Sequence, residues 1–502
     1  MTSSRIPRVR VVVSWCDENR DDPMPQHCAG EPLDGLSLDL DTDLRDCRSD
    51  GSQSRSVQAV PPKRAVTTPG VSWCSAAACS MAVLWSAQAM GADAFSGPTT
   101  ATGASAGINP AAFAGTDRSL SAMAELGITY AVISYQREAS GGLNPAVYAP
   151  VEFHAWLPDL PFSISIPTPW SSLNALVGGF FLATGGAQWP ADGPQRYYSA
   201  SSVLYAYSLD AGLLYSPSPD WGVALTAGPA FYYTSQHLAV DLGARLNDYL
   251  GAVTVAPENP ALEGWSAANA WTVAPAAVLG VWAAPGDSLH VGVGCILPAQ
   301  PTLRGTVKTT LPAVVPRSLA SLAPEGAIAI QYPMPWSVNL EADFFSKRWK
   351  FLPGLTYTHS RTQQATIANV TTAQPSLVEG TSPAIIAYHD SWTTSFGVAY
   401  VSELDWEVWA RASYHHIAIP TEAVSPINMD FTYYALSLGV RWKLSEQRRL
   451  ALTFIPTYLL PVHVTSSIYN SYAPASSGLQ YPAATGWYRA AATQFYVSFE
   501  GI

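Results

Sequence analysis

Apolar residues alternate with small or polar residues over long stretches of the chain beyond residue 125. The alternation is clearest over residues 271–297, in two runs that a turn at 285–287 separates. One face of these runs is apolar: Trp271, Val273, Ala277, Leu279, Val281, Leu289, Val291, Val293, Cys295 and Leu297. The opposite face carries small residues such as Gly280, Gly292 and Gly294. Because successive side chains of a strand point to opposite faces, this spacing predicts a β-hairpin with one apolar face.

The same pattern recurs in four more segments, each of them built around a short turn. The expected hairpins are 209–225, 328–344, 396–414 and 436–454, with turns at 216–220, 333–335, 402–405 and 445–447. Polar residues occupy the other face of several of these strands: Asn339, Glu341, Asp343, Glu407, Arg411, Arg441 and Lys443. An apolar exterior around a polar lumen is typical of a transmembrane β-barrel, and Trp or Tyr beside the turns is typical of its interfacial girdle.

The connections between the expected strands alternate between short and long. The tight turns are separated by longer stretches near 235–268, 299–325, 350–390, 415–432 and 461–489. Short periplasmic turns and long extracellular loops are a known asymmetry of outer-membrane barrels. The segments predict an all-β fold, a transmembrane antiparallel β-barrel of about fourteen strands that begins near Leu126 and closes with residues 494–501. A large soluble β-sandwich or propeller is the alternative.

Composition favours the barrel over these soluble folds. Only 13% of the 502 residues are charged, about half of the usual soluble level, whereas 48% are hydrophobic. No segment reaches the ~18 uninterrupted apolar residues of a membrane-spanning helix, which excludes a helical membrane protein. The net charge of −11 argues against nucleic acid as a partner, because phosphates call for a surplus of Lys and Arg.

The first ninety-odd residues differ from the rest of the chain. Residues 1–62 are charged and aperiodic, and we interpret them as disordered or as an upstream extension from a misassigned start codon. Residues 63–94 combine a basic pair, an apolar stretch at 73–85 and small-residue cleavage sites, the pattern of a secretory signal peptide. A buried helix of a soluble domain is the alternative for this stretch. Cys295 is the single cysteine beyond residue 79, which excludes a disulfide framework in the main body.

The segment 95–124, between the signal peptide and the first strand, carries a recognisable motif. Its Asn109, Pro110 and Ala111 resemble the NPA-type motif in the N-terminal hatch of FadL-type outer-membrane transporters. Later segments resemble the successive hairpins of that family: LLYSPSPDWGVALTAG, VLGVWAAPGDSLHVGVGCILPAQPTLRGTV and SVNLEADFFSKRW. The resemblance covers residues 95–502 and implies a hatch at 95–124 followed by a barrel at 125–502.

The resemblance also implies a function. FadL-type proteins are monomeric barrels of the bacterial outer membrane, plugged by an N-terminal segment, that take up hydrophobic compounds and release them sideways into the membrane lipid. Long-chain fatty acids are the first expected ligand, and aromatic hydrocarbons are the alternative. An envelope scaffold, a secretion-associated receptor and an open porin are rival functions for the same barrel. No cofactor, no metal and no covalent chemistry are expected.

Three basic residues, Arg304, Arg411 and Arg441, are candidates for contact with a ligand in the lumen. Each could bind a fatty acid carboxylate, since charge-assisted hydrogen bonds are strong there. Each could instead pair with Glu341, Asp343 or Glu407 across the lumen wall, and this pairing is the interpretation that we favour for each residue.

Two further patterns suggest an enzyme or a metal site and are rejected. Residues 103–107 match the GxSxG pattern of hydrolases, but a Pro/Thr-rich stretch precedes the serine and Asn-Pro follows it, in place of a strand and a helix. His415 and His416 are adjacent in an expected strand, so their side chains point to opposite faces and cannot share one ion.

Overall fold

The computed structural model describes most of the chain beyond residue 96. The described residues are 97–116, 119–138, 149–241, 243, 258–312, 314, 325–362, 365–372, 380–385, 388–445, 447–467 and 484–501. The expected N-terminal extension at 1–62 and the expected signal peptide at 63–94 lie outside this part of the chain.

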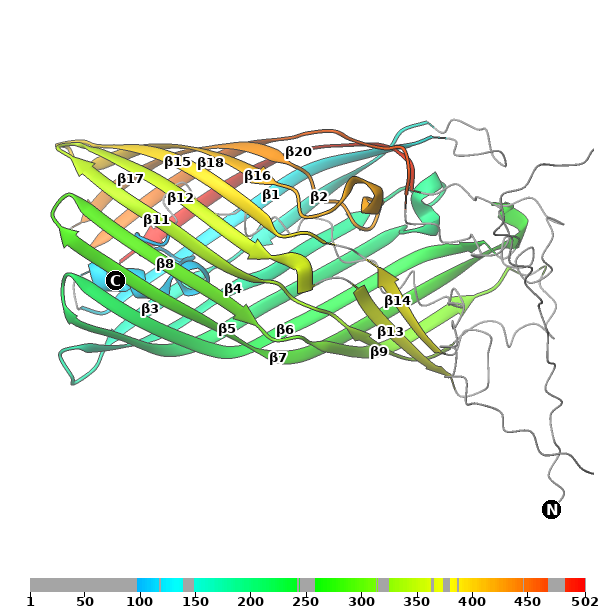
Figure 1. Ribbon diagram of the computed structural model, residues 1–502, viewed down its shortest axis with the longest axis horizontal. Coiled ribbons are helices and arrows are strands. Elements are labelled where there is room, and N and C mark those ends of the chain that lie inside the picture. Colours follow the sequence, from blue (N-terminus) through cyan, green and yellow to red (C-terminus); the bar gives the residue numbers. More distant parts are fainter. Residues whose placement is uncertain are drawn as a thin grey trace, which may run out of the picture. The chain divides into compact units, whose positions relative to one another are not determined.

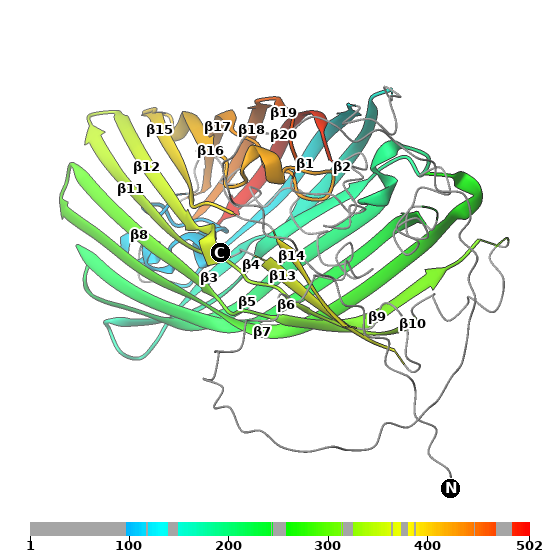
Figure 2. The ribbon, with the colours of Figure 1, turned by 45° about the vertical axis from the view of Figure 1, so that its right-hand side comes forward.

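The described residues form a closed antiparallel β-barrel of fourteen strands, which confirms the predicted fold class. Several barrel strands are interrupted and therefore carry two labels each: β2 with β3, β8 with β9, β10 with β11, β12 with β13, β14 with β15, and β18 with β19. The strands run obliquely to the long axis in both views of the ribbon (Figures 1 and 2).

The first half of the barrel consists of β1 Ser121–Arg137, β2 Val151–Asp159, β3 Phe162–Pro167, β4 Leu173–Gln188, β5 Ser201–Ser218, β6 Trp221–Asp241, β7 Glu263–Gly286, β8 Leu289–Pro298, β9 Thr302–Thr310 and β10 Glu325–Gln331. The second half consists of β11 Trp336–Ser346, β12 Trp349–His359, β13 Ala365–Thr372, β14 Gly380–Ile385, β15 Ser391–Val401, β16 Trp406–His416, β17 Tyr433–Ser445, β18 Arg448–Leu459, β19 Val462–Val464 and β20 Gly486–Glu500.

The barrel closes where its first and last strands meet. β1 pairs with β20 from Met123 opposite Glu500 to Arg137 opposite Gly486. The first strand begins at Ser121 rather than near Leu126, and the last is longer than the predicted 494–501. Closure pairs the backbone groups that an open sheet would leave at its edges, which is a requirement for strands in lipid.

The outer face of the barrel is apolar and the inner face is polar, as the alternation predicts. Leu225 and Phe231 on β6 are 51% and 48% exposed, whereas Thr226, next to Leu225, is 2% exposed. The inward-facing Glu341 and Arg411 are buried. An exposed apolar surface of this extent suits hydrocarbon and would be costly in water.

One predicted turn is wrong. Residues 333–335 do not reverse the chain: β10 and β11 follow one another in the same barrel strand, β10 against β9 and β11 against β8. The chain reverses instead at Lys347, which has a positive φ of 56°. Pro333 and Pro335 lack the N–H group that a ladder needs, so they interrupt the strand without turning it. Because the chain reverses at Lys347 and not at 333–335, the strands β12, β13 and β14 occupy the expected long loop at 350–390.

The helical elements are short: α3 Ser105–Ile108, η1 Pro110–Gly115, η2 Pro194–Tyr197, η3 Pro260–Leu262, η5 Ser360–Thr362 and η6 Thr421–Ala423. Among the residues described, no helix has the length and hydropathy needed to cross a membrane. α3 and η1 (blue in Figure 1) lie within the ring of strands, near the end that carries the tight turns. We call residues 97–116 the N-terminal segment.

Candidate functional site

A cavity of about 200 Å³ lies inside the barrel. Residues of β4, β11, β12, β15 and β16 line its sides, and Gly97, Pro98, Ala104, Gly107 and Ile108 of the N-terminal segment contribute to its lining. Two chemically different walls face each other across this space.

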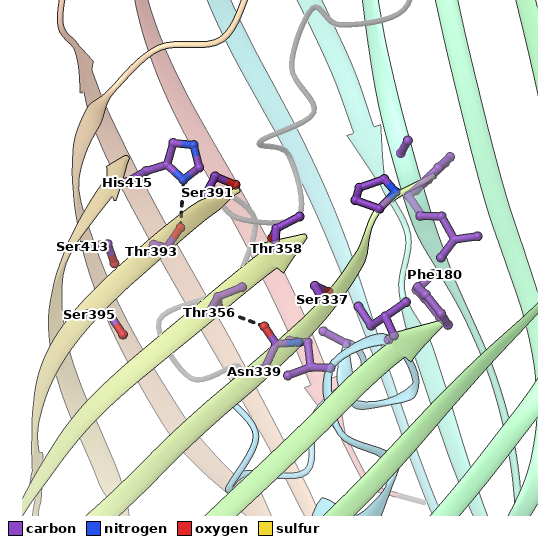
Figure 3. Close-up of a pocket in the computed structure, with 18 of the residues that line it drawn as sticks. Phe180, Ser337, Asn339, Thr356, Thr358, Ser391, Thr393, Ser395, Ser413 and His415 are labelled. Atoms are coloured by element: carbon purple, nitrogen blue, oxygen red, sulfur yellow. Dashed lines mark hydrogen bonds between the residues drawn. The ribbon is translucent and has the colours of Figure 1, made fainter. Parts of the chain in front are cut away.

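The first wall is lined by short polar side chains from four adjacent strands, and we call it the hydroxyl wall. Its members are Ser337 and Asn339 on β11, Thr356 and Thr358 on β12, Ser391, Thr393 and Ser395 on β15, and Ser413 and His415 on β16. Figure 3 shows these side chains on neighbouring strands, with Phe180 on the far side of the cavity. The contributing residues of each strand are two positions apart, because alternate side chains share a face.

The second wall is apolar and is formed by β2, the connection between β2 and β3, and β4. We call it the apolar wall: Leu157, Pro158, Pro161, Phe180, Phe181, Leu182 and Ala183. Phe180 and Leu182 are 4% and 6% exposed. A β-bulge between Phe181 and Ala183 lies in this part of β4, and bulges bend a strand and redirect its side chains.

The apolar wall contains an interruption of the barrel ladder. β3 pairs with β4 only as far as Gly179, and β2 pairs with β1. Within the described residues 151–188, no backbone pairing joins β2 to residues 180–188 of β4. Pro158 and Pro161 flank the break between β2 and β3, and neither can donate to a ladder. We call the boundary between β2 and residues 180–188 the unpaired seam, and the cavity reaches residues on both of its sides.

Asn109 ties the N-terminal segment to the barrel. Its side-chain amide donates to the carbonyl oxygens of Pro98, at 2.6 Å, and Val281, at 2.9 Å. Its side-chain oxygen accepts from the N–H of Ala111, at 3.0 Å, and so caps η1, which begins with Pro110. The motif of Asn109, Pro110 and Ala111 therefore combines a helix cap with an attachment to the wall.

Glycines on β7 and β8 make room for this segment. A Cβ at Gly280 would overlap the side-chain oxygen of Asn109, and one at Gly294 would overlap the carbonyl oxygen of Ile108. These are the small residues opposite the apolar face in the sequence pattern, and the structure shows what they accommodate. Only a residue without Cβ permits so close an approach of two backbones.

Carboxylates and an indole hold the start of the segment. The Thr99 hydroxyl lies 2.7 Å from an oxygen of Glu341 and 2.8 Å from one of Asp343. The Trp282 indole N–H donates to the carbonyl oxygen of Thr99, at 3.0 Å. All four side chains are buried, so these hydrogen bonds are shielded from water.

The structure brings two of the three candidate arginines into buried ion pairs. Arg411 lines the cavity and pairs with Glu341 at 2.7 Å. Arg441 lies outside the cavity lining and pairs with Glu407 and, at 3.0 Å, with Glu500. The candidate Arg304 is exposed beside the buried Leu303, so it lies on the outer face of β9 and is not brought to the cavity.

The two rejected patterns have ordinary structural roles. The Ser105 hydroxyl of the GxSxG segment accepts from the N–H of Thr102, at 2.8 Å, within a local turn. His415 points inward, with Nδ1 2.9 Å from the Thr393 hydroxyl, whereas His416 stacks on the exposed Trp392. The hydroxyl wall, the apolar wall and the unpaired seam were not found by sequence reasoning. Pro158 and Pro161 were the available signal for the seam.

The sequence itself matches no protein-family model and no curated protein. Solved structures nevertheless share the fold. A Pseudomonas aeruginosa FadL homologue has a TM-score of 0.69 at 14% identity, over 82% of this chain and 96% of that chain. The Pseudomonas putida toluene transporter TodX has a TM-score of 0.60 at 14% identity, over 84% and 98%.

A third structure, the Ralstonia pickettii toluene transporter TbuX, has a TM-score of 0.57 at 10% identity, over 84% of this chain and 98% of that chain. Two of these three neighbours are described as toluene transporters and one as a FadL homologue, and all three share one barrel architecture. The fold of this chain is therefore that of the FadL-type barrels.

Proposed function

We propose that this protein is a FadL-type transporter of the bacterial outer membrane that carries hydrophobic compounds. One observation carries the proposal: an internal cavity with an apolar wall extends to a seam where the barrel ladder is unpaired. The fold shared with a FadL homologue and with toluene transporters supports it.

The proposed route runs from the cavity through the unpaired seam into the surrounding lipid. Burial of apolar surface contributes about 0.8 kcal/mol per CH₂ group, which favours entry into the cavity from water. Leaving sideways keeps the molecule away from the charged side chains Glu407, Arg441 and Glu500 of the lumen. No covalent step is part of this function.

The N-terminal segment closes the lumen in this proposal. Its attachments to Val281, Glu341 and Asp343 support such a role, because they join it to two different strands of the wall. Transport would then need no wide aqueous pore. The proposed unit is a monomer, and its lipid-facing belt is the exposed apolar face.

Long-chain fatty acids and aromatic hydrocarbons are the proposed substrates. The apolar wall suits the chain of the first and the ring of the second, as ligand pockets are mostly apolar with a few polar groups. Two solved neighbours are described as toluene transporters, which supports the aromatic candidate, and the fatty acid candidate rests on the likeness to a FadL homologue.

Uptake by living cells tests the function. A strain that lacks its own hydrophobic-compound transporters is given this gene, and uptake of labelled oleate and labelled toluene is measured. We expect faster uptake of at least one of them than with an empty vector. Expression in the outer membrane without uptake of either compound would contradict the proposal and favour a scaffold or receptor.

Conductance in planar bilayers tests the rival porin function. A barrel closed by the N-terminal segment passes little ion current, whereas an open porin passes a large and steady current. Steady porin-like conductance of the unmodified protein would contradict closure of the lumen.

A further inference from the structure

The hydroxyl wall is ordered in rows that cross several strands. Backbone register places Ser337 opposite Thr358 and Thr358 opposite Ser391. In a second row, Asn339 lies opposite Thr356, Thr356 opposite Thr393, and Thr393 opposite His415. In a third row, Ser395 lies opposite Ser413. Directly opposed residues have Cβ atoms about 5 Å apart, so the rows form a continuous polar surface.

Several of these hydroxyls have spare hydrogen-bonding capacity. Thr356 donates to Asn339 at 2.8 Å, and Thr393 lies 2.9 Å from Nδ1 of His415. The hydroxyls of Ser337, Ser395 and Ser413 make no side-chain hydrogen bond with any residue that the structure describes. A hydroxyl offers one donor and two acceptor sites, so this wall can serve an oxygen atom of either kind.

The charged side chains of the cavity do not favour an anion. Asp159, Glu341 and Asp430 line it, and Arg411 is the arginine among its lining residues. That arginine already pairs with Glu341 at 2.7 Å. An ionised carboxylate in this space would lie near more negative than positive charges. The free-energy cost of removing it from water would therefore be poorly compensated.

A pure hydrocarbon is not a good match for this wall either. A chain pressed against Ser337, Ser395 and Ser413 would remove their hydroxyls from water and return no hydrogen bond. Leaving a polar group unsatisfied costs about 1–3 kcal/mol, whereas a paired one stabilises by about 1 kcal/mol. The wall therefore penalises a ligand without polar atoms.

We propose that the cavity selects hydrophobic molecules that carry an uncharged oxygen-containing group, such as a hydroxyl or an ester. The inference rests on the proposed transport function and names its substrate class. The apolar wall contacts the chain or ring of the ligand, and the hydroxyl wall forms hydrogen bonds with its oxygen atom. Ionised fatty acids and bare hydrocarbons, the substrates proposed above, still bind to the apolar wall but less tightly than these molecules.

Three ligands with the same kind of chain separate these cases: oleyl alcohol, oleate and octadecene. Equilibrium binding of each labelled compound is measured on the full-length protein in detergent, at about pH 9, where a carboxyl group is ionised. We expect the alcohol to bind about tenfold more tightly than either of the others. Equal or tighter binding of oleate or octadecene would overturn the inference while leaving hydrophobic transport intact.

Substitutions in the wall identify the binding group. The triple variant Ser337→Ala, Ser395→Ala, Ser413→Ala should weaken binding of oleyl alcohol about tenfold, as loss of one to two hydrogen bonds would. Binding of octadecene should stay the same or improve. Unchanged binding of the alcohol would contradict the role of the wall.

Thr234→Val is the matched control. Thr234 also faces inward on β6 and is 3% exposed, and its hydroxyl has no hydrogen-bond partner among the described residues, but it does not line the cavity. It should leave binding of all three compounds unchanged. If the wild-type protein binds none of them, the proposed function fails together with the inference.

Discussion

Asn109 donates a hydrogen bond from its side-chain amide to the carbonyl oxygen of Val281, 2.9 Å away on β7. The two residues are far apart in the sequence, and this bond joins the N-terminal segment to the barrel wall. The same side chain bridges to Pro98 and caps the helix that begins at Pro110. One asparagine thus sets both the local shape of the segment and its place in the barrel.

Replacing Asn109 by Ala should release the N-terminal segment. Three hydrogen bonds are lost, each worth about 1 kcal/mol, so the population of the detached segment should rise by about two orders of magnitude. The expected result is a marked increase of ion conductance in planar bilayers. Conductance equal to that of the wild type would contradict the attachment role.

Asn259→Ala provides the control for this variant. Asn259, Pro260 and Ala261 repeat the same three residue types, and the Asn259 side chain accepts from the N–H of Ala261 at 3.0 Å. η3 has no buried residue and takes no part in the N-terminal segment. Loss of this cap should leave conductance unchanged.

Gly294→Val should displace the N-terminal segment by steric overlap. A Cβ at Gly294 meets the carbonyl oxygen of Ile108, which is backbone and cannot rotate away. We expect a cysteine placed at Ala112, which is 1% exposed, to become accessible to a water-soluble thiol reagent. Gly286→Val, in the turn of the same hairpin with open space around it, should leave that cysteine protected.

Arg441→Met should destabilise the barrel strongly. It leaves the carboxylates of Glu407 and Glu500 without their buried guanidinium partner, a loss of about 3–5 kcal/mol. Lys443→Met on the same strand should cost less than about 1 kcal/mol, because Lys443 and Asp405 are 3.8 Å apart and partly exposed. Urea unfolding in lipid vesicles measures the free energy of unfolding of both variants. An equal decrease in the two would contradict the larger contribution of the buried ion pairs.

Phe181→Asp should slow transport at the unpaired seam. It places a charge on β4 where the cavity meets the seam, and an apolar molecule would have to pass it. We expect uptake of the best substrate to fall by about tenfold or more, as about 1.4 kcal/mol of added barrier would produce.

Val177→Asp is the control for the seam variant. Val177 lies on the same strand, is 39% exposed to lipid and sits in the part of β4 that pairs with β3. Both variants carry a similar cost of insertion, so uptake is compared at equal amounts of protein in the outer membrane. An equal decrease in both would mean that the seam has no special role.

The sequence predicted the barrel well because alternating apolar and polar residues give each strand one apolar face and one polar face. Leu225 and Thr226 illustrate this, since adjacent positions differ in exposure as a lipid face and a lumen face require. The ion pairs of Arg411 and Arg441 were foreseen as one of two alternatives, because the residue types permitted them.

Other features depend on which strands become neighbours, and the sequence does not specify this. The rows of the hydroxyl wall exist only because Thr356 and Thr393 fall opposite each other in the register of β12 and β15. Pro333 and Pro335 were misread as a turn, since a proline that interrupts a strand and one that reverses it have the same local signature. Arg304 was assigned to the lumen without a periodic context that would fix its face.

Photochemical labelling tests whether the cavity between the two walls holds the hydrophobic ligand. A long-chain alcohol with a diazirine in its chain is bound to the purified protein, irradiated, and the labelled residues are identified by mass spectrometry. Binding in the cavity predicts labels on the apolar wall, above all at Phe180–Ala183, that excess oleyl alcohol competes away. Labels confined to the lipid-facing residues, such as Leu225 and Phe231, and insensitive to competitor would contradict it.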